Sequence, residues 1–180
     1  GEAWNAYLAS VEAVLTRRPF LLGERFTIVD ASVYGQLGMN LADPTAGDEM
    51  RRRAPTTYRW LEAVRDRQHV GGRGVLMLGD ELADLLAIVG RTFVPLMRQN
   101  ERAYEDACRR GERVFNERAF DARRALYDGR LLGKPFRSVA KTFQVRVWRE
   151  LRDAWRRLEP EARAQLVPLI PDGDVLGETC

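Results

Sequence analysis

The stretch from Arg18 to Leu37 constrains the fold more than any other part of the chain. Pro19 ends any helix that precedes it, and Gly23 allows the chain to turn. Thr27 then stands at an N-cap position with Asp30 three residues later, which is the spacing of a capping box. In such a box the threonine hydroxyl accepts a hydrogen bond from the Asp30 amide, and the carboxylate accepts one from the Thr27 amide. We therefore expect a capped helix to begin directly after Thr27.

This stretch belongs to a longer string that resembles a known protein family. Residues 20–32 read Phe-Leu-Leu-Gly-Glu-Arg-Phe-Thr-Ile-Val-Asp-Ala-Ser, which resembles the segment between the fifth and sixth helices of the glutathione transferase C-terminal domain. Ala-Pro at 54–55, followed by Arg-Trp-Leu at 59–61, resembles the start of the eighth helix of that domain. The resemblance covers residues 1 to about 68. It implies that the threonine and aspartate of the capping box are structural residues and not catalytic ones.

The resemblance also implies an activity. Glutathione transferases carry the Ser, Tyr or Cys that activates the glutathione thiolate on a thioredoxin-like N-terminal domain, which has no counterpart in this sequence. The helix that usually comes first in the C-terminal domain of these transferases has no counterpart in this sequence either. We therefore expect the chain to be the helical part of a protein that conjugates glutathione to electrophiles, with no catalytic residue of its own. Glutathione would be a co-substrate, and no cofactor is expected. The alternative is a non-catalytic helical module that binds a ligand or a protein.

Composition bounds the partners and the compartment. The net charge is only +3, which by itself is no signature of nucleic-acid binding. No apolar run approaches the roughly 20 residues that a membrane-spanning helix needs, and the N-terminus does not read as a secretory signal. The two cysteines, Cys108 and Cys180, are too few for a disulfide framework, so we expect a cytoplasmic protein. The expected partners are a second copy and a thioredoxin-like domain; membranes and nucleic acid are not expected.

Apolar periodicity indicates helices along the first third of the chain. They are expected over residues 2–17, 28–41 and 46–53, with a fourth beginning just after residue 55. Thr56 or Thr57 would cap the fourth helix, while Glu2 and Glu12 of the first helix would face away from the core. Residues 71–79 are rich in glycine but lack the spacing of a phosphate-binding loop, so they are interpreted as a linker.

A long helical pattern follows the linker. Asp80 is expected to cap it, and Arg109 with Arg110 before a glycine would end it. Pro95 removes one backbone hydrogen bond, so the helix should kink or split near Thr92. Ion pairs four residues apart, such as that between Glu105 and Arg109, would lie on its solvated face.

A β-hairpin is expected near residues 123–137, turning at Gly133, with residues 128–129 as the competing turn. Ser138 would cap the following long helix, and Pro160 would open a last short one. This extension resembles that of bacterial transferase-like proteins in which the helical domain continues into a hairpin and a helix. The predicted fold is therefore all-α. A transferase C-terminal-like helical bundle covers 1–70, a linker covers 71–79, and an extension with a small hairpin and a long helix covers 80–180.

Polar residues with binding potential gather in this extension. Cations alternate with aromatic residues around the hairpin and the helix after it, in a set made of Arg123, Tyr127, Arg137, Lys141, Gln144 and Arg146. From it we select four ligand-binding candidates: Tyr127, Arg137, Lys141 and Gln144. Arg137 and Lys141 lie four residues apart and would share a helix face or its approach, walled by Tyr127 and Phe136. They would hold a carboxylate-bearing ligand; the competing interpretation is a solvated basic face.

Other chemistry has little support in the sequence. His69 is the only histidine, and neither cysteine has a partner at ligand spacing, so we expect no metal site. A histidine-dependent nucleophile would have to use His69, which is better explained as a surface residue. Cys108 is interpreted as a half-buried structural thiol, because a helix C-terminus raises the pKa of a thiol.

Overall fold

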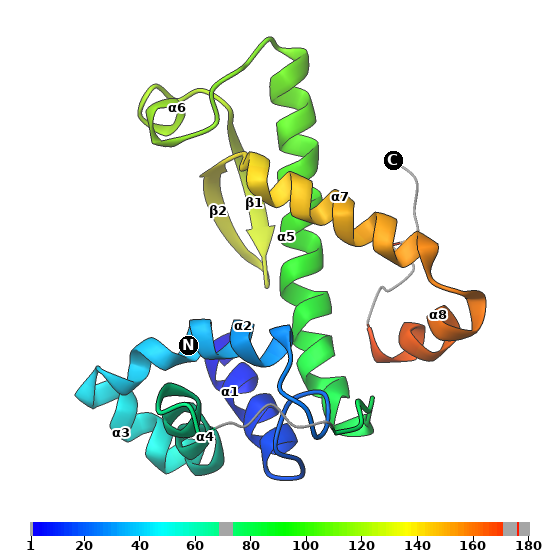
Figure 1. The fold of residues 1–180 in the computed structure, drawn as a ribbon. Coiled ribbons are helices and arrows are strands. Elements are labelled where there is room, and N and C mark those ends of the chain that lie inside the picture. Colours follow the sequence, from blue (N-terminus) through cyan, green and yellow to red (C-terminus); the bar gives the residue numbers. More distant parts are fainter. Residues whose placement is uncertain (1, 69–73, 171–175, 177–180) are drawn as a thin grey trace. The chain divides into compact units, whose positions relative to one another are not determined.

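The computed structural model describes residues 2–68, 74–170 and 176. The chain divides into two compact units, unit 1 (Gly1–Leu85) and unit 2 (Leu86–Cys180). Both are mainly helical, and unit 2 also contains a two-stranded antiparallel hairpin (Figure 1). This confirms the predicted fold class of helices with one small hairpin. Among the described residues, none of the helices combines the length and the apolar character needed to cross a bilayer.

Unit 1 is a helical bundle built around the buried faces of four helices. These are α1 (Glu2–Leu15), α2 (Ile28–Leu37), α3 (Pro44–Arg53) and α4 (Pro55–Arg65), with 3-10 turns at Gly38–Leu41 and Asp80–Leu82. Each of the four contributes almost fully buried apolar side chains to the core, among them Leu8, Val11, Val14, Leu37, Met50 and Leu61. At the start of α3, the exposed Asp43 side chain accepts hydrogen bonds from the amides of Thr45 (2.8 Å) and Ala46 (3.0 Å).

The capping box at the start of α2 forms as predicted. Thr27 is the N-cap in an extended conformation, and both reciprocal hydrogen bonds of the box are present. Asp30 is completely buried. Its Oδ2 accepts from the Thr27 amide (2.8 Å) and hydroxyl (2.7 Å), while its Oδ1 accepts from the amide of Leu21 (2.8 Å). The carboxylate therefore fixes the helix start and the preceding loop to each other.

The start of α4 is capped differently from the prediction. Pro55 is its first residue, and the N-cap Ala54 offers no side-chain hydrogen bond. Glu12 of α1 supplies the acceptor instead: its carboxylate accepts from the amides of Thr56 (2.9 Å) and Thr57 (2.7 Å) and from the Thr57 hydroxyl (2.7 Å). The predictions that a threonine caps α4 and that Glu12 faces away are wrong. The two threonines lie inside the first turn, so their amides are the donors that need a partner.

We expect Glu12→Gln to lower the free energy of unfolding by about 1–2 kcal/mol near pH 7, because the amide is a weaker acceptor at a helix start. Burial alone would raise the pKa of Glu12, but hydrogen bonds from Thr57 and Thr56 outweigh it and hold the pKa below its usual 4.5. A carboxyl whose folded pKa is depressed stabilises the protein above its unfolded pKa and loses this contribution as the pH falls through the folded value.

The advantage of the wild type over Glu12→Gln should therefore shrink in acid, below the usual carboxyl pKa. Urea midpoints of both proteins across this pH range measure it, with Glu2→Gln on the exposed side of α1 as the matched control. A difference that stays constant through the acid range would contradict the role of the ionised carboxylate.

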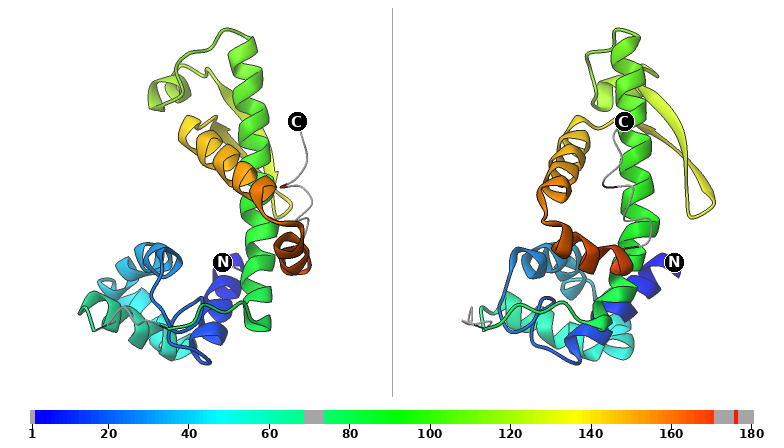
Figure 2. Two further views of the ribbon diagram at one scale, coloured as in Figure 1. Left: turned by 45° about the vertical axis from the view of Figure 1, so that its right-hand side comes forward. Right: turned by 90° about the vertical axis from the view of Figure 1, so that its right-hand side faces the viewer.

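Unit 2 is organised on the long helix α5 (Ala83–Arg109), whose bounds include the unit boundary. The other elements are α6 (Glu117–Asp121), β1 (Leu126–Leu131), β2 (Lys134–Val139), α7 (Thr142–Arg157), α8 (Pro160–Leu166) and a 3-10 turn (Val167–Leu169). In the right-hand view of Figure 2, the hairpin and α7 lie on opposite sides of α5. Pro160 opens α8 at its first position, as predicted.

The long helix differs from its prediction at two points. It does not split near Thr92, because α5 continues through Pro95; a kink at Pro95, the other predicted outcome, stays a prediction. The neighbouring Val94 and Met97 pack into a buried cluster with two tryptophans of α7, and this burial outweighs one missing backbone hydrogen bond. Asp80 does not cap α5 either, since it begins a separate 3-10 turn whose N-cap is Gly79.

The hairpin turns where the sequence predicts. Leu132 and Gly133 have φ values of 50° and 76°, which is the left-handed pair that a tight two-residue hairpin turn requires. Gly129 lies within β1 instead, where a Cβ would come within 2.5 Å of the Phe136 ring and 2.7 Å of the Gln99 side chain. Gln99 of α5 accepts from the Arg130 amide (2.8 Å) and donates to the Arg130 carbonyl (2.9 Å), and so fixes the hairpin on α5.

Ser138 is not a helix cap. It lies in β2, opposite Tyr127, and α7 begins only at Thr142 with Lys141 as its N-cap residue. The strand continues further than predicted because the amide of Ala140 adds one more hydrogen bond, to the carbonyl of Ala125 (3.1 Å).

Candidate functional site

A polar cavity in unit 2 lies between α6, β2 and the residue before α7. It is open to solvent and has a volume of about 600 Å³. Its wall combines aromatic, basic and small polar side chains, contributed by Phe115, Asn116, Glu117, Arg118, Phe120, Arg137, Ser138, Val139 and Lys141.

Small buried residues bring the walls of this cavity together. One buried cluster is formed by Ala107 of α5, Ala119 of α6, Ala125 just before β1, and Val139 of β2, with Phe115 packed against it. Alanine side chains allow the short helix to approach the strand closely. Sequence reasoning missed α6, although Asn116 was a visible signal: its side chain accepts from the Arg118 amide (3.1 Å) as the N-cap.

Arg137 reaches the cavity from β2 while paired with a carboxylate across the hairpin. Its Nε and Nη2 donate to the two oxygens of Asp128, at 2.6 and 2.8 Å. These hydrogen bonds lower the pKa of Asp128 and raise that of Arg137, so both groups stay charged at neutral pH. Both side chains are about two-thirds exposed, at 64% and 68%, so the pair is a solvated one that another anion can join.

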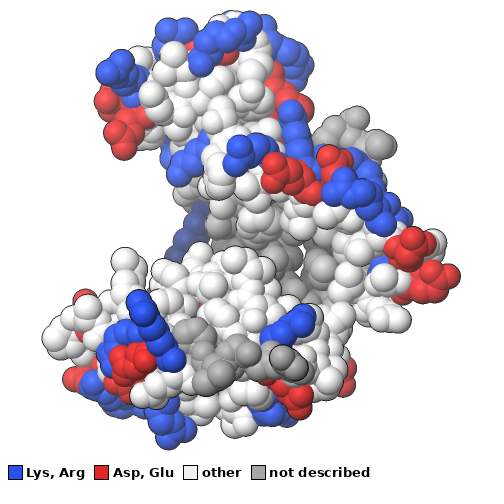
Figure 3. Space-filling model, viewed as in Figure 1, with Lys and Arg blue, Asp and Glu red and all other residues white. Residues whose placement is uncertain are grey.

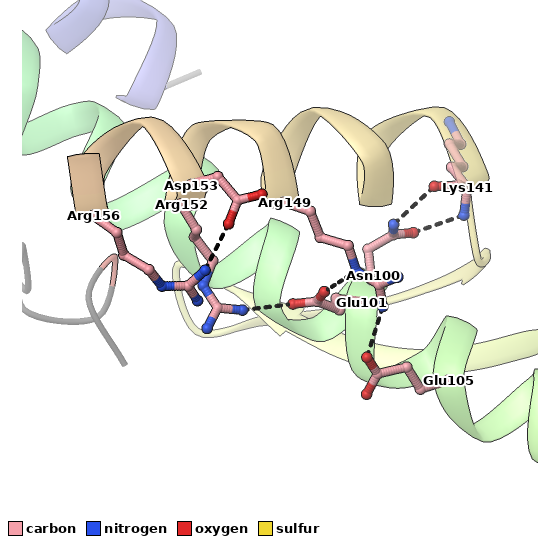
Figure 4. A network of polar contacts seen from close by, with 8 residues as sticks. All are labelled: Asn100, Glu101, Glu105, Lys141, Arg149, Arg152, Asp153 and Arg156. Carbon is pink, nitrogen blue, oxygen red and sulfur yellow. Dashed lines mark hydrogen bonds and ion pairs between the residues drawn. The ribbon is translucent and has the colours of Figure 1, made fainter. Parts of the chain in front are cut away.

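Lys141 is held by its backbone. The side-chain amide of Asn100, on α5, is almost fully buried; it accepts from the Lys141 amide (2.8 Å) and donates to the Lys141 carbonyl (3.0 Å). Both bonds are drawn in Figure 4. Because Asn100 fixes the backbone, the exposed lysine side chain starts from a defined point on the rim of the cavity.

The structure brings together two of the four predicted ligand-binding residues. Arg137 and Lys141 line one cavity, although they come from a strand and from the residue before a helix, not from one helix face. Tyr127 and Gln144 are not among its lining residues. The expectation that Tyr127 and Phe136 wall the Arg137 position is wrong.

Strand geometry explains this correction. Successive side chains of a strand point to opposite faces, and Arg137 pairs with Asp128, one residue beyond Tyr127. Tyr127 packs edge-on against Phe136, with ring centroids 5.7 Å apart. Burial there raises the pKa of Tyr127 above its usual value.

A second polar cluster ties α5 to α7 (Figure 4). Glu101 is 4% exposed and accepts from Arg149 (2.6 Å) and from the buried Arg152 (3.2 Å). Arg149 also donates to the more exposed Glu105 (2.8 Å). The predicted ion pair between Glu105 and Arg109 is wrong, since Arg109 pairs with Asp106 instead. Hydrogen bonding to Glu101 raises the pKa of Arg149. This cluster joins two helices through three ion pairs between carboxylates of α5 and arginines of α7.

The remaining candidates from the sequence lie elsewhere. Cys108 is half-buried on α5 as a free thiol, and its hydrogen bond with Tyr104 raises the pKa of that tyrosine. Among the described residues, no group of three His, Cys, Asp or Glu side chains lies close enough to hold a metal ion. His69 and Cys180 lie outside the described residues.

Comparison with known proteins finds one family model that the first part of the chain matches. Residues 2–68 match the family model of the glutathione S-transferase C-terminal domain. No curated protein and no solved structure matches the chain. The matched range agrees with the predicted resemblance and contains the Thr27–Asp30 capping box. The cavity between α6 and β2 lies beyond it.

Proposed function

We propose that the chain is the helical part of a glutathione transferase-like protein, because residues 2–68 match the family model of the glutathione S-transferase C-terminal domain. Joined to a thioredoxin-like half, it would conjugate glutathione to electrophiles in the cytoplasm, as a homodimer. The observation that carries this proposal is the family match over the segment in which the buried Asp30 box forms. Glutathione would be the co-substrate, and its activating group would come from the other half.

An exposed apolar segment of unit 1 supports a partner domain. Residues 75–78 are Val-Leu-Met-Leu, and their side chains are 46–62% exposed. Their backbone is tied to the loop before α2, since the Glu24 amide donates to the Val75 carbonyl (3.1 Å) and the Met77 amide to the Leu22 carbonyl (2.9 Å). Consecutive exposed apolar residues are typical of surfaces that another domain covers.

The second candidate function is a non-catalytic ligand-binding module. It is favoured by one observation: the cavity with Arg137 and Lys141 lies wholly within unit 2, outside the matched residues. A ligand could bind there without a contribution from another domain.

A conjugation assay distinguishes the two. The chain alone should neither turn over a chloronitroaromatic electrophile with glutathione nor be retained on immobilised glutathione. A longer protein that joins this chain to a thioredoxin-like half should do both. Turnover by the chain alone would mean that the active site was assigned to the wrong part of the molecule. A longer protein that carries a thioredoxin-like half and still neither binds nor uses glutathione would favour the non-catalytic module.

A further inference from the structure

We propose that the cavity between α6 and β2 binds a small organic anion: a carboxylate carried on a planar apolar group. This site lies in unit 2 and does not depend on the proposed transferase activity. Its lining offers both kinds of contact that such a ligand needs, cationic groups and aromatic surface.

The anionic half of the ligand would contact Arg118, Arg137 and Lys141, which all line this cavity. Within the part of the chain that the structure describes, no acidic side chain forms an ion pair with Arg118 or Lys141. Arg137 is engaged by Asp128 through Nε and Nη2, and its Nη1 takes no part in that pair. A carboxylate in the cavity would therefore meet two cations that form no ion pair with the described acidic side chains. Charge-assisted hydrogen bonds to such groups are the strong ones.

The apolar half would contact Phe115, Phe120 and Val139. Phe120 is 50% exposed, so part of its ring is open to a ligand. Phe115 is fixed from behind by the alanine cluster and by Tyr104, whose ring centroid is 4.9 Å away. A rigid aromatic wall beside an exposed one favours a flat ligand, which can stack on both.

Size and charge favour a small anion over a polyanion. A volume of about 600 Å³ is in the range of ordinary small-molecule sites. Glu117 also lines the cavity and would repel a chain of phosphates that passes through it, whereas a single carboxylate needs to contact only the cations. Lysine and arginine side chains also gather on the end of unit 2 that carries α6 (Figure 3), which would draw anions toward the site.

Calorimetric titration of the whole chain with 1-naphthoate tests this inference. We expect binding that weakens about 3–10-fold in Arg137→Gln and in Lys141→Gln, as expected for one charge-assisted contact at a partly exposed site. Phe120→Ser should weaken it by a similar factor through the apolar half. Arg146→Gln on α7 and Lys134→Gln at the hairpin turn are the matched controls, because both are exposed cations outside the cavity. These should bind as the wild type does.

Three further ligands separate the contributions. The neutral 1-naphthamide should bind at least tenfold more weakly than the acid, and inorganic phosphate should bind weakly because it lacks an apolar body. Equal binding of acid and amide, or equal losses in the cavity variants and their controls, would overturn the site. Tight, steeply salt-dependent binding of a DNA duplex without binding of naphthoate would also overturn it, in favour of a nucleic-acid surface. Circular dichroism of each variant, all altered at exposed positions, confirms that folding is retained.

Discussion

Asp30→Ala should lower the free energy of unfolding of unit 1 by about 3–5 kcal/mol, since each buried donor that loses its partner costs about 1–3 kcal/mol. The carboxylate has no exposed surface and accepts three hydrogen bonds, from the Leu21 amide and from the amide and hydroxyl of Thr27. Both amides would be left without their acceptor, and the alanine would leave a small void beside them. This is more than an ordinary helix cap contributes.

Asp43→Ala is the matched control for this prediction. Asp43 also caps a helix of unit 1 and also accepts from two amides, but it is exposed, so water can replace the lost acceptor. We expect a loss of about 1 kcal/mol there. Urea midpoints followed by far-UV circular dichroism, with hydrogen exchange of residues 20–37, measure both. Equal losses in the two variants would show that burial of Asp30 adds nothing to the cap.

Glu101→Gln should destabilise unit 2 by about 3–5 kcal/mol, the cost of breaking a buried ion pair from one side. The substitution keeps the shape of the side chain and removes its charge, so Arg152, which is 6% exposed, would keep its own charge beside a neutral amide. The NH2 of the glutamine amide would also present N–H donors to an arginine, which has no acceptor.

Glu105→Gln gives the comparison, because both glutamates accept from Arg149 and lie one helical turn apart. The pair with Glu105 is about half exposed, at 48% and 41%, and should contribute less than about 1 kcal/mol. Thermal or urea unfolding of the two variants and the wild type measures the difference. A loss in Glu105→Gln as large as that in Glu101→Gln would contradict the assignment of the buried carboxylate as the principal link between α5 and α7.

What could be predicted from the sequence depended on local chemistry. The Thr27–Asp30 box and the turn at Gly133 need only residues three apart or fewer, and both are present in the structure. The cap on α4 could not be predicted because Glu12 lies 44 residues before Thr56, and no pattern within a helix indicates so distant an acceptor. The continuity of α5 through Pro95 could not be predicted for a related reason: the local cost of a proline is visible in the sequence, and the packing that compensates for it is not.

The candidate site follows the same division. Arg137 and Lys141 were selected because cations cluster near the hairpin, and they do line one cavity. The wall opposite them comes from α6, whose five residues carry too little periodicity to indicate a helix. Tyr127 was assigned to the wrong face, because one residue of strand register moves a side chain through the sheet.

Three consecutive residues of α5 fix the hairpin and α7 of unit 2 to this helix. Gln99 fixes the hairpin through Arg130, Asn100 fixes the backbone before α7, and Glu101 fixes the middle of α7. Neighbouring residues of a helix point roughly 100° apart, so this short stretch reaches in three directions at once. An insertion or deletion here would rotate all three contacts away from their partners together. Across related sequences, length changes should therefore collect in the loops on either side of α6 and be excluded from this turn, even where the individual side chains vary.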